Sequence, residues 1–243
     1  MTDSAETWKI RYHENYSRVM PASEYSVILE NKMMDMQDMY PFRGDSRDYY
    51  VLRKAVKAIA NVPGLVMEIG LREGGGMKII LDELIATRKP WNVISIDPYG
   101  SIPFKGADGE ELEESEYTNR MKCETLEKMY RFLTDYPNIN WLFFPLEDTE
   151  FFNRYGNGVP VYTDTTSSYL NTYSLVHFDG PHETDVVMTE VDFFLPRTVV
   201  GSMFVFDDVE HFYDHKKVEE YIFQRGFECI EKTDVKAMYR RMK

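Results

Sequence analysis

One strand–glycine–helix stretch in the first third of the chain constrains the fold more than any other feature. An apolar run over residues 65–69 contains Glu68 and stops at Gly70, and three adjacent glycines follow at positions 74–76. The apolar run predicts a buried strand, and the apolar spacing after the glycines predicts a helix over 77–87. A glycine-rich turn at a helix N-terminus exposes backbone N–H groups to a polar or anionic ligand. The sequence therefore predicts a βα unit with a ligand-binding turn.

The spacing of these glycines argues against two common nucleotide-binding motifs. The pattern E-x-G-x-x-x-G-G fits neither the dinucleotide fingerprint G-x-G-x-x-G nor the phosphate loop G-x-x-x-x-G-K-[ST]. No Lys-Ser or Lys-Thr pair follows the glycines, which argues against a nucleoside triphosphate as the ligand. An ordinary βα turn, in which the glycines serve only tight packing, is the alternative interpretation.

The rest of the chain alternates between predicted strands and helices. Further strands are expected over 92–96, 140–144, 174–178, 202–206, 227–230 and 237–241, and further helices over 48–60, 116–135, 185–195 and 215–225. This order predicts an α/β fold with a mostly parallel sheet covered by helices on both faces. Segments 100–115 and 150–173 are expected to be irregular surface loops. Residues 1–60 are expected to form a helical cap with the first helix, and residues 61–243 the ligand-binding domain.

Composition narrows the class of partner. The formal net charge of −13 argues against nucleic acid and anionic membranes, because both require a basic face. No apolar run reaches the roughly 18 residues of a spanning helix, and the first residues lack the pattern of a secretory signal. The two cysteines, Cys123 and Cys229, lie far apart and outside any C-x-x-C pair. A cytoplasmic protein that binds a small molecule is expected, and the Met-rich helix over 25–39 is a candidate dimer surface.

Acidic residues are expected at the carboxyl ends of several strands, where open parallel sheets bind their ligands. Asp97 follows the second strand and is placed to accept hydrogen bonds from the hydroxyls of a ribose. Asp179 follows the fourth strand, and Asp207 and Asp208 follow the fifth. Three such carboxylates suit Mg²⁺, Mn²⁺ or Ca²⁺ better than a soft metal. The alternative is a set of solvated acids that only form turns.

These motifs together resemble a known group of enzymes. The pattern E-x-G-x-x-x-G-G, the acid Asp97, the run from Asp179 to His182 and the pair Asp207-Asp208 are similar to those of the metal-dependent O-methyltransferases grouped with macrocin O-methyltransferase and the cephalosporin hydroxylase family. The resemblance covers about residues 62–210. It implies a Rossmann-like class I methyltransferase fold with seven strands. It also implies S-adenosylmethionine (SAM) as cofactor, bound by Glu68, Gly70, Gly74, Gly75, Asp97 and Glu147.

The resemblance further implies a metal and a catalytic base. In that family the equivalents of Asp179, Asp207 and Asp208 hold Mg²⁺, and the metal binds hydroxyls of the substrate. The macrocin-type branch has an acid two residues after the first metal ligand, where this chain has Pro181. The prediction for the base therefore moves to His182, with Asp179 as the second catalytic residue. The implied reaction is SAM- and metal-dependent O-methylation of a small molecule such as a sugar or a glycosylated natural product.

Two other functions are alternatives to methyl transfer. A nucleotide-cofactor oxidoreductase is disfavoured because the second glycine of G-x-G and a suitably placed Tyr-x-x-x-Lys pair are both missing. A non-catalytic nucleotide-binding module would bind the cofactor without any effect of a metal.

Overall fold

A computed structural model describes most of the chain after residue 41. The described residues are 42–44, 46–100, 103–105, 112–114, 117–163, 166–210 and 212–243. They belong to a compact unit that spans residues 42–243. The expected cap and the candidate dimer helix over 25–39 lie outside the described residues. The division into a cap and a ligand-binding domain stays a prediction.

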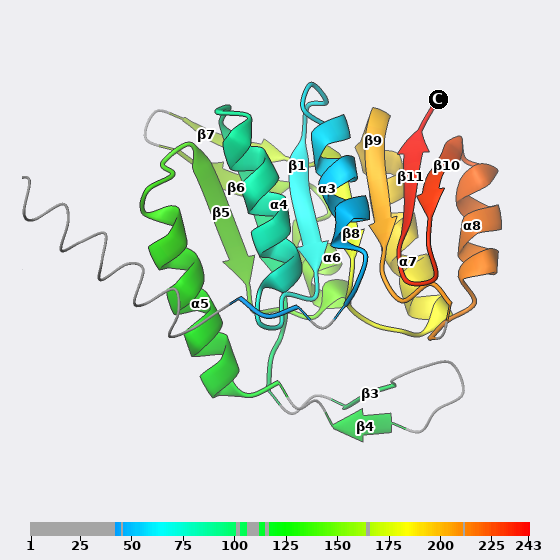
Figure 1. The fold of residues 1–243 in the computed structure, drawn as a ribbon, viewed down its shortest axis with the longest axis horizontal. Helices are drawn as coiled ribbons and strands as arrows, with labels where there is room; N and C mark the ends of the chain where they lie inside the picture. Colours follow the sequence, from blue (N-terminus) through cyan, green and yellow to red (C-terminus); the bar gives the residue numbers. More distant parts are fainter. Residues whose placement is uncertain are drawn as a thin grey trace, which may run out of the picture. The chain divides into compact units, whose positions relative to one another are not determined.

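A seven-stranded sheet forms the centre of this unit (Figure 1). The strand order across the sheet is β10-β11-β9-β8-β1-β2-β5. The five central and early strands pair in parallel: β1 (Leu65–Ile69), β2 (Trp91–Ile96), β5 (Ile139–Phe144), β8 (Tyr173–Phe178) and β9 (Thr198–Phe206). At one edge, β11 (Ala237–Arg241) pairs antiparallel with both β9 and β10 (Phe227–Lys232). The mostly parallel sheet is therefore confirmed.

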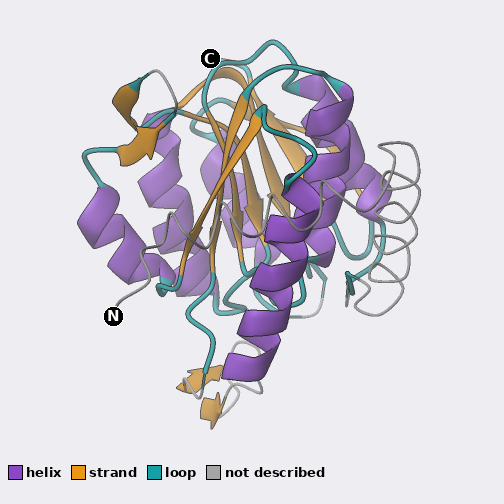
Figure 2. Ribbon diagram, turned by 90° about the vertical axis from the view of Figure 1, so that its left-hand side faces the viewer, coloured by secondary structure: helices purple, strands orange, loops and turns teal. Residues whose placement is uncertain are grey.

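Helices cover both faces of the sheet, as Figure 2 shows with the sheet nearly edge-on. The first face packs against α3 (Tyr49–Ala58), α4 (Gly75–Ala86) and α5 (Asn119–Leu133). The second packs against α6 (Asp148–Tyr155), α7 (Thr184–Phe194) and α8 (His215–Phe223), with the 3-10 turn η1 (Leu195–Arg197) after α7. Side chains alternate between the faces, so Val66 packs on the α3–α4 side and Met67 on the other.

The prediction for segment 150–173 was wrong. The segment contains most of α6 and a hairpin of β6 (Val159–Tyr162) and β7 (Ser167–Leu170). Within this polar segment, a short alternation of buried and exposed side chains is typical of a strand: Val159 and Val161 are buried, while Tyr162 is exposed. In segment 100–115, two short strands, β3 (Pro103–Lys105) and β4 (Leu112–Glu114), pair antiparallel.

The helices of the described ranges differ from membrane-spanning helices. None of them combines sufficient length with sufficient apolar character.

Candidate functional site

The acids singled out in the sequence lie at one edge of the sheet, the edge at which the parallel strands reach their carboxyl ends. Each of three acids directly follows its strand and extends the backbone pairing by one residue. The amide N–H of Asp97 donates to Phe144 O at 3.3 Å, that of Asp179 to Ile69 O at 3.0 Å, and that of Asp207 to Phe178 O at 3.0 Å. The carboxyl ends of β1, β2, β8 and β9 therefore meet at a common edge, as expected for parallel strands.

Strand alternation brings a buried Glu–His pair to the α3–α4 side of this edge. His177 Nδ1 lies 3.1 Å from Glu68 Oε1, and both side chains are buried. Burial, together with the positive charge of nearby Lys236, lowers the pKa of His177 to about 3, so the ring is neutral. A hydrogen bond therefore joins the His177 ring to the carboxyl group of Glu68. His177 Nε2 has no hydrogen-bond partner among the described residues.

The glycine loop, residues 70–76 after β1, packs closely against other parts of the chain. A Cβ on Gly75 would lie 2.5 Å from the carbonyl oxygen of Arg43, and one on Gly74 would lie 2.6 Å from Met129 Cε. Gly70, with φ of +85°, packs against the backbone carbonyl of Asp179. These contacts give each glycine a packing role, which is the alternative interpretation of the loop. The predicted contact of Gly70, Gly74 and Gly75 with a cofactor stays a prediction.

Asp97 organises the turn that follows β1. Its Oδ2 accepts from the backbone N–H groups of Leu71 at 3.1 Å and Arg72 at 2.8 Å, and its Oδ1 accepts from Tyr99 N at 3.0 Å. The Tyr99 hydroxyl in turn donates to the carbonyl of Arg72. Burial raises the pKa of Asp97, although the three N–H donors oppose this. Asp97 therefore joins the ends of β1 and β2, and its contact with a ribose stays a prediction.

Backbone strain is concentrated at the same edge. Three non-glycine residues that follow strand ends have left-handed backbones: Arg72 with φ of 44°, Tyr99 with φ of 49° and Asp208 with φ of 53°. Such conformations cost free energy and are typical of functional sites, where the surrounding structure holds them in place. The strain supports this edge as the site.

Asp179 and Asp207 form a pair of acids. A hydrogen bond joins their carboxyl groups, and burial together with the negative charge of Asp207 raises the pKa of Asp179 well above its usual range. The carboxyl group of Asp179 is therefore held by Asp207.

A lysine outside the set of predicted site residues completes this cluster. Lys236 is fully buried, and its ammonium group contacts Asp207 Oδ2 and donates to Ser46 Oγ at 2.8 Å. Ser46 donates in turn to Asp207 Oδ1 at 2.8 Å. A lysine within the apolar run from Val235 to Tyr239 is the signal that could have identified it.

The second acid of the pair after β9 faces a different partner. His182 Nε2 lies 3.0 Å from Asp208 Oδ2, and about a quarter of each side chain is exposed. The ring of Phe212 lies 4.7 Å from that of His182 and is tilted by 35°. The structure thus joins His182 to Asp208 and Asp179 to Asp207, although the sequence analysis assigned all three acids to one metal ion.

The carboxylates as arranged do not fit a divalent ion. The carboxyl group of Asp179 is bonded to Asp207, both oxygens of Asp207 are bonded within the chain, and Asp208 faces His182. Glu68, His177 and Asp179 offer a second set of ligand atoms within 4.8 Å of one another. There Nδ1 of His177 is bonded to Glu68, so Nε2 is the ring nitrogen left to bind an ion. The metal ligands Asp179, Asp207 and Asp208 therefore stay a prediction that the observed bonding opposes.

Glu147, the last predicted cofactor contact, lies apart from these acids at the end of β5. It directly precedes α6, and its Oε2 accepts from Thr149 Oγ1 at 2.9 Å. Two strands, β2 and β1, separate β5 from β8, which carries Asp179. Its role stays a prediction.

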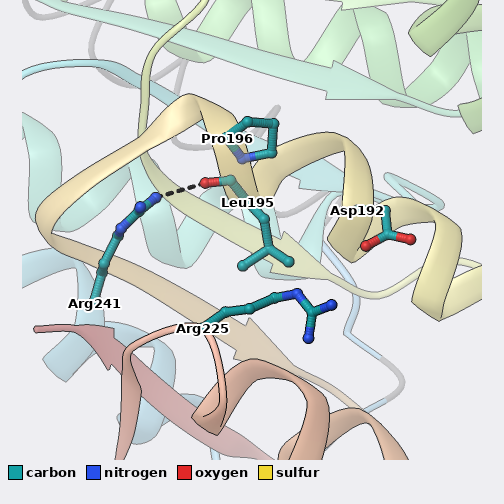
Figure 3. A pocket seen from close by; sticks show the side chains of 5 residues that line it. All are labelled: Asp192, Leu195, Pro196, Arg225 and Arg241. Carbon is teal, nitrogen blue, oxygen red and sulfur yellow. Dashed lines mark hydrogen bonds between the residues drawn. The ribbon is translucent and has the colours of Figure 1, made fainter. Parts of the chain in front are cut away.

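A pocket of about 390 Å³ lies at the opposite edge of the sheet (Figure 3). It is lined by Asp192, Leu195, Pro196, Arg225 and Arg241. Arg241 Nη1 donates to the carbonyls of Leu195 at 2.5 Å and Thr198 at 2.9 Å. Arg241 thus holds the start of β9, and the pocket contains none of the predicted site residues.

Comparison with known proteins identifies the fold. No protein-family model matches the sequence, and no curated protein matches it. The structure is similar to that of the O-methyltransferase NovP, with a TM-score of 0.51 and 18% identity over 80% of this chain and 79% of NovP. This chain has the class I methyltransferase fold. At this identity the likeness establishes the fold alone.

A second methyltransferase structure has the same fold. The MycE methyltransferase from the mycinamycin biosynthetic pathway, in complex with Mg and SAH, has a TM-score of 0.50 and 13% identity. The match covers 86% of this chain and 54% of MycE. The class I methyltransferase fold predicted from the motifs is therefore confirmed.

Proposed function

We propose that this protein is a SAM-dependent O-methyltransferase that acts on a hydroxyl group of a small molecule such as a sugar. The proposal rests on the pairing of His182 with Asp208 at the carboxyl edge of a class I methyltransferase fold. Both side chains are partly exposed there, so a substrate hydroxyl can reach them. NovP is an O-methyltransferase, which agrees with this choice of acceptor.

The cofactor would lie along the ends of three neighbouring strands. The predicted contacts follow β1, β2 and β5, which are adjacent in the sheet. Glu68 and the glycine loop would face the methionine part, Asp97 the ribose and Glu147 the adenine. When bound, SAM supplies an electrophilic methyl group on a sulfonium.

His182 would remove the proton from the acceptor hydroxyl. An aliphatic hydroxyl is a weak nucleophile until a base takes its proton. With Nε2–H donated to Asp208, the lone pair of His182 Nδ1 is available as the acceptor. The hydroxyl proton would move to His182 Nδ1 as the oxygen attacks the methyl carbon that bound SAM would supply, and sulfur would keep the electrons of its broken bond to that carbon. Asp208 orients the ring and stabilises the imidazolium that forms.

The proposed mechanism uses neither a metal ion nor Asp179 as a direct catalyst. Lys236, Ser46 and His182 already bond to the acids that would bind a metal ion. The carboxyl group of Asp179 is bonded to Asp207, so it does not face the substrate hydroxyl in this mechanism.

Calorimetric titration with S-adenosylhomocysteine (SAH) and with NAD⁺ tests the proposal. Binding of SAH, followed by transfer of label from methyl-labelled SAM to a panel of sugars and nucleotide sugars, is the expected result. Binding of NAD⁺ without SAH would instead favour an oxidoreductase. SAH binding with no transfer to any hydroxylated acceptor would favour a non-catalytic binding module.

A further inference from the structure

The ammonium group of Lys236 occupies the position beside Asp207 where a bound cation would be expected. It contacts Asp207 Oδ2, donates to Ser46 Oγ at 2.8 Å, and lies 4.8 Å from the centre of the Tyr49 ring. Asp207 Oδ1 accepts from Ser46 Oγ at 2.8 Å and from Asp208 N at 2.9 Å. Both oxygens of the carboxylate are therefore already bonded.

The backbone holds Lys236 firmly in this place. Its N–H donates to Thr233 Oγ1 at 2.9 Å, and its carbonyl accepts from Thr233 N at 2.8 Å. The neighbouring Val235 carbonyl accepts from Val209 N at 3.1 Å, which ties this turn to the loop after Asp207. Because β11 runs antiparallel to β9, the residue that precedes β11 reaches the edge where β9 ends. The position of Lys236 is thus fixed by the backbone contacts of this turn and by the pairing of β11 with β9.

A divalent ion and this lysine compete for the same oxygens. Mg²⁺, Mn²⁺ and Ca²⁺ bind through carboxylate lone pairs, and Lys236 and Ser46 use those of Asp207. An ion beside Asp207 would also lie next to a buried positive charge, which repels it. The charge of the acid pair is meanwhile balanced by Lys236, a compact cation with three donors.

We propose that Lys236 replaces a divalent cation at this edge, so that the site around Asp179 and Asp207 takes no metal. If the proposed function holds, methyl transfer by this protein then needs no divalent ion. Lys236 acts as a positioning residue: it fixes Asp207, and through Asp207 the carboxyl group of Asp179.

Titration of the full chain with Mn²⁺, followed by electron paramagnetic resonance in the absence of SAM, tests this proposal. The wild-type protein should show no site tighter than about 1 mM. Lys236→Met should gain one Mn²⁺ site, and Lys236→Met/Asp207→Asn should lose it again. A wild-type site that Asp207→Asn or His177→Gln abolishes would overturn the proposal.

The test does not require the Lys236→Met variant to fold, because the wild-type titration alone can contradict the proposal. It also does not depend on the proposed function, since no cofactor is present. Activity gives a second readout if SAM-dependent transfer is found. The rate should be unchanged after exhaustive treatment with a chelator, and loss of turnover that Mg²⁺ restores would overturn the proposal.

Discussion

His182 Nε2 lies 3.0 Å from Asp208 Oδ2 at the edge of the sheet where β8 and β9 end. The two residues reach this position from different loops, and neither is buried. A histidine whose one nitrogen is bonded to a carboxylate presents its other nitrogen as a base. The same bond orients the ring, as in other base–carboxylate pairs.

Replacement of either member of this pair should slow methyl transfer while leaving cofactor binding intact. His182→Ala should lower kcat by about 10²-fold or more, because it removes the proton acceptor. Asp208→Asn should lower it less, and the double variant should be no slower than His182→Ala, because the two act as a unit. Single-turnover rates with labelled SAM, together with SAH affinity by calorimetry, measure both effects.

Asp185→Asn is the matched control for Asp208→Asn. Asp185 also accepts from a basic side chain, Lys217 at 3.2 Å, but is 92% exposed on α7. Its replacement should leave both the rate and the SAH affinity unchanged. Equal rates for His182→Ala and the wild type would remove the base role of His182.

Lys236→Met should strongly destabilise the fold. It leaves the buried Asp207 without its cation, and the loss of one partner from a buried pair costs about 3–5 kcal/mol. Addition of Asp207→Asn should recover part of this loss, because the uncompensated charge is then gone. Urea unfolding gives the free energies. The exposed pair Lys54–Glu231, at 2.8 Å, provides the control, and Lys54→Met should cost less than about 1 kcal/mol.

The sheet and its covering helices could be predicted because their apolar spacing is regular. Every residue of β1 and β8 is buried, and most of these residues are apolar, which marks both segments as interior strands. The hairpin of β6 and β7 was missed because only Val159 and Val161 signal it, within a polar segment. A two-residue alternation is too short to distinguish a strand from a loop.

The acids of the site were predictable from position, whereas their partners were not. Parallel strands end at one edge, so the acids that follow them must meet there. Lys236 precedes an antiparallel strand, and only the pairing of β11 with β9 brings it to this edge. Asp207 and Asp208 are adjacent in sequence, but the left-handed backbone of Asp208 directs the two carboxylates to different partners.

Stability should fall as the pH drops from about 6.5, because His215 is buried in its neutral form. Burial, and then the charge of Lys232, lowers the pKa of His215 to about 3, so the unfolded chain binds the proton first. The contribution of His215 to the free energy of unfolding is complete above the unfolded pKa of about 6.5 and is lost progressively toward pH 3. The loss amounts to about 2 kcal/mol at pH 5.

His215→Phe isolates this contribution. His215 Nε2 lies 2.7 Å from the Tyr239 hydroxyl, which keeps a partner in the variant because it donates to Glu219 at 2.8 Å. The difference in unfolding free energy between pH 7.5 and pH 5 should be smaller in the variant by about 2 kcal/mol. If the unfolding free energies of the two proteins fell equally with pH, His215 would bind its proton as readily in the folded chain as in the unfolded chain, which would contradict the prediction.

Gly75→Ala should destabilise the protein even without a cofactor. The new Cβ would lie 2.5 Å from Arg43 O and from Gly44 Cα, and backbone atoms cannot move aside as a flexible side chain can. Overpacking of this kind costs about 1–3 kcal/mol. Gly156→Ala is the control: its φ of −58° is helical, so alanine fits and the change should stay below about 1 kcal/mol. Thermal and urea unfolding of both variants decide the question, and wild-type stability in Gly75→Ala would mean that the loop is looser than its contacts indicate.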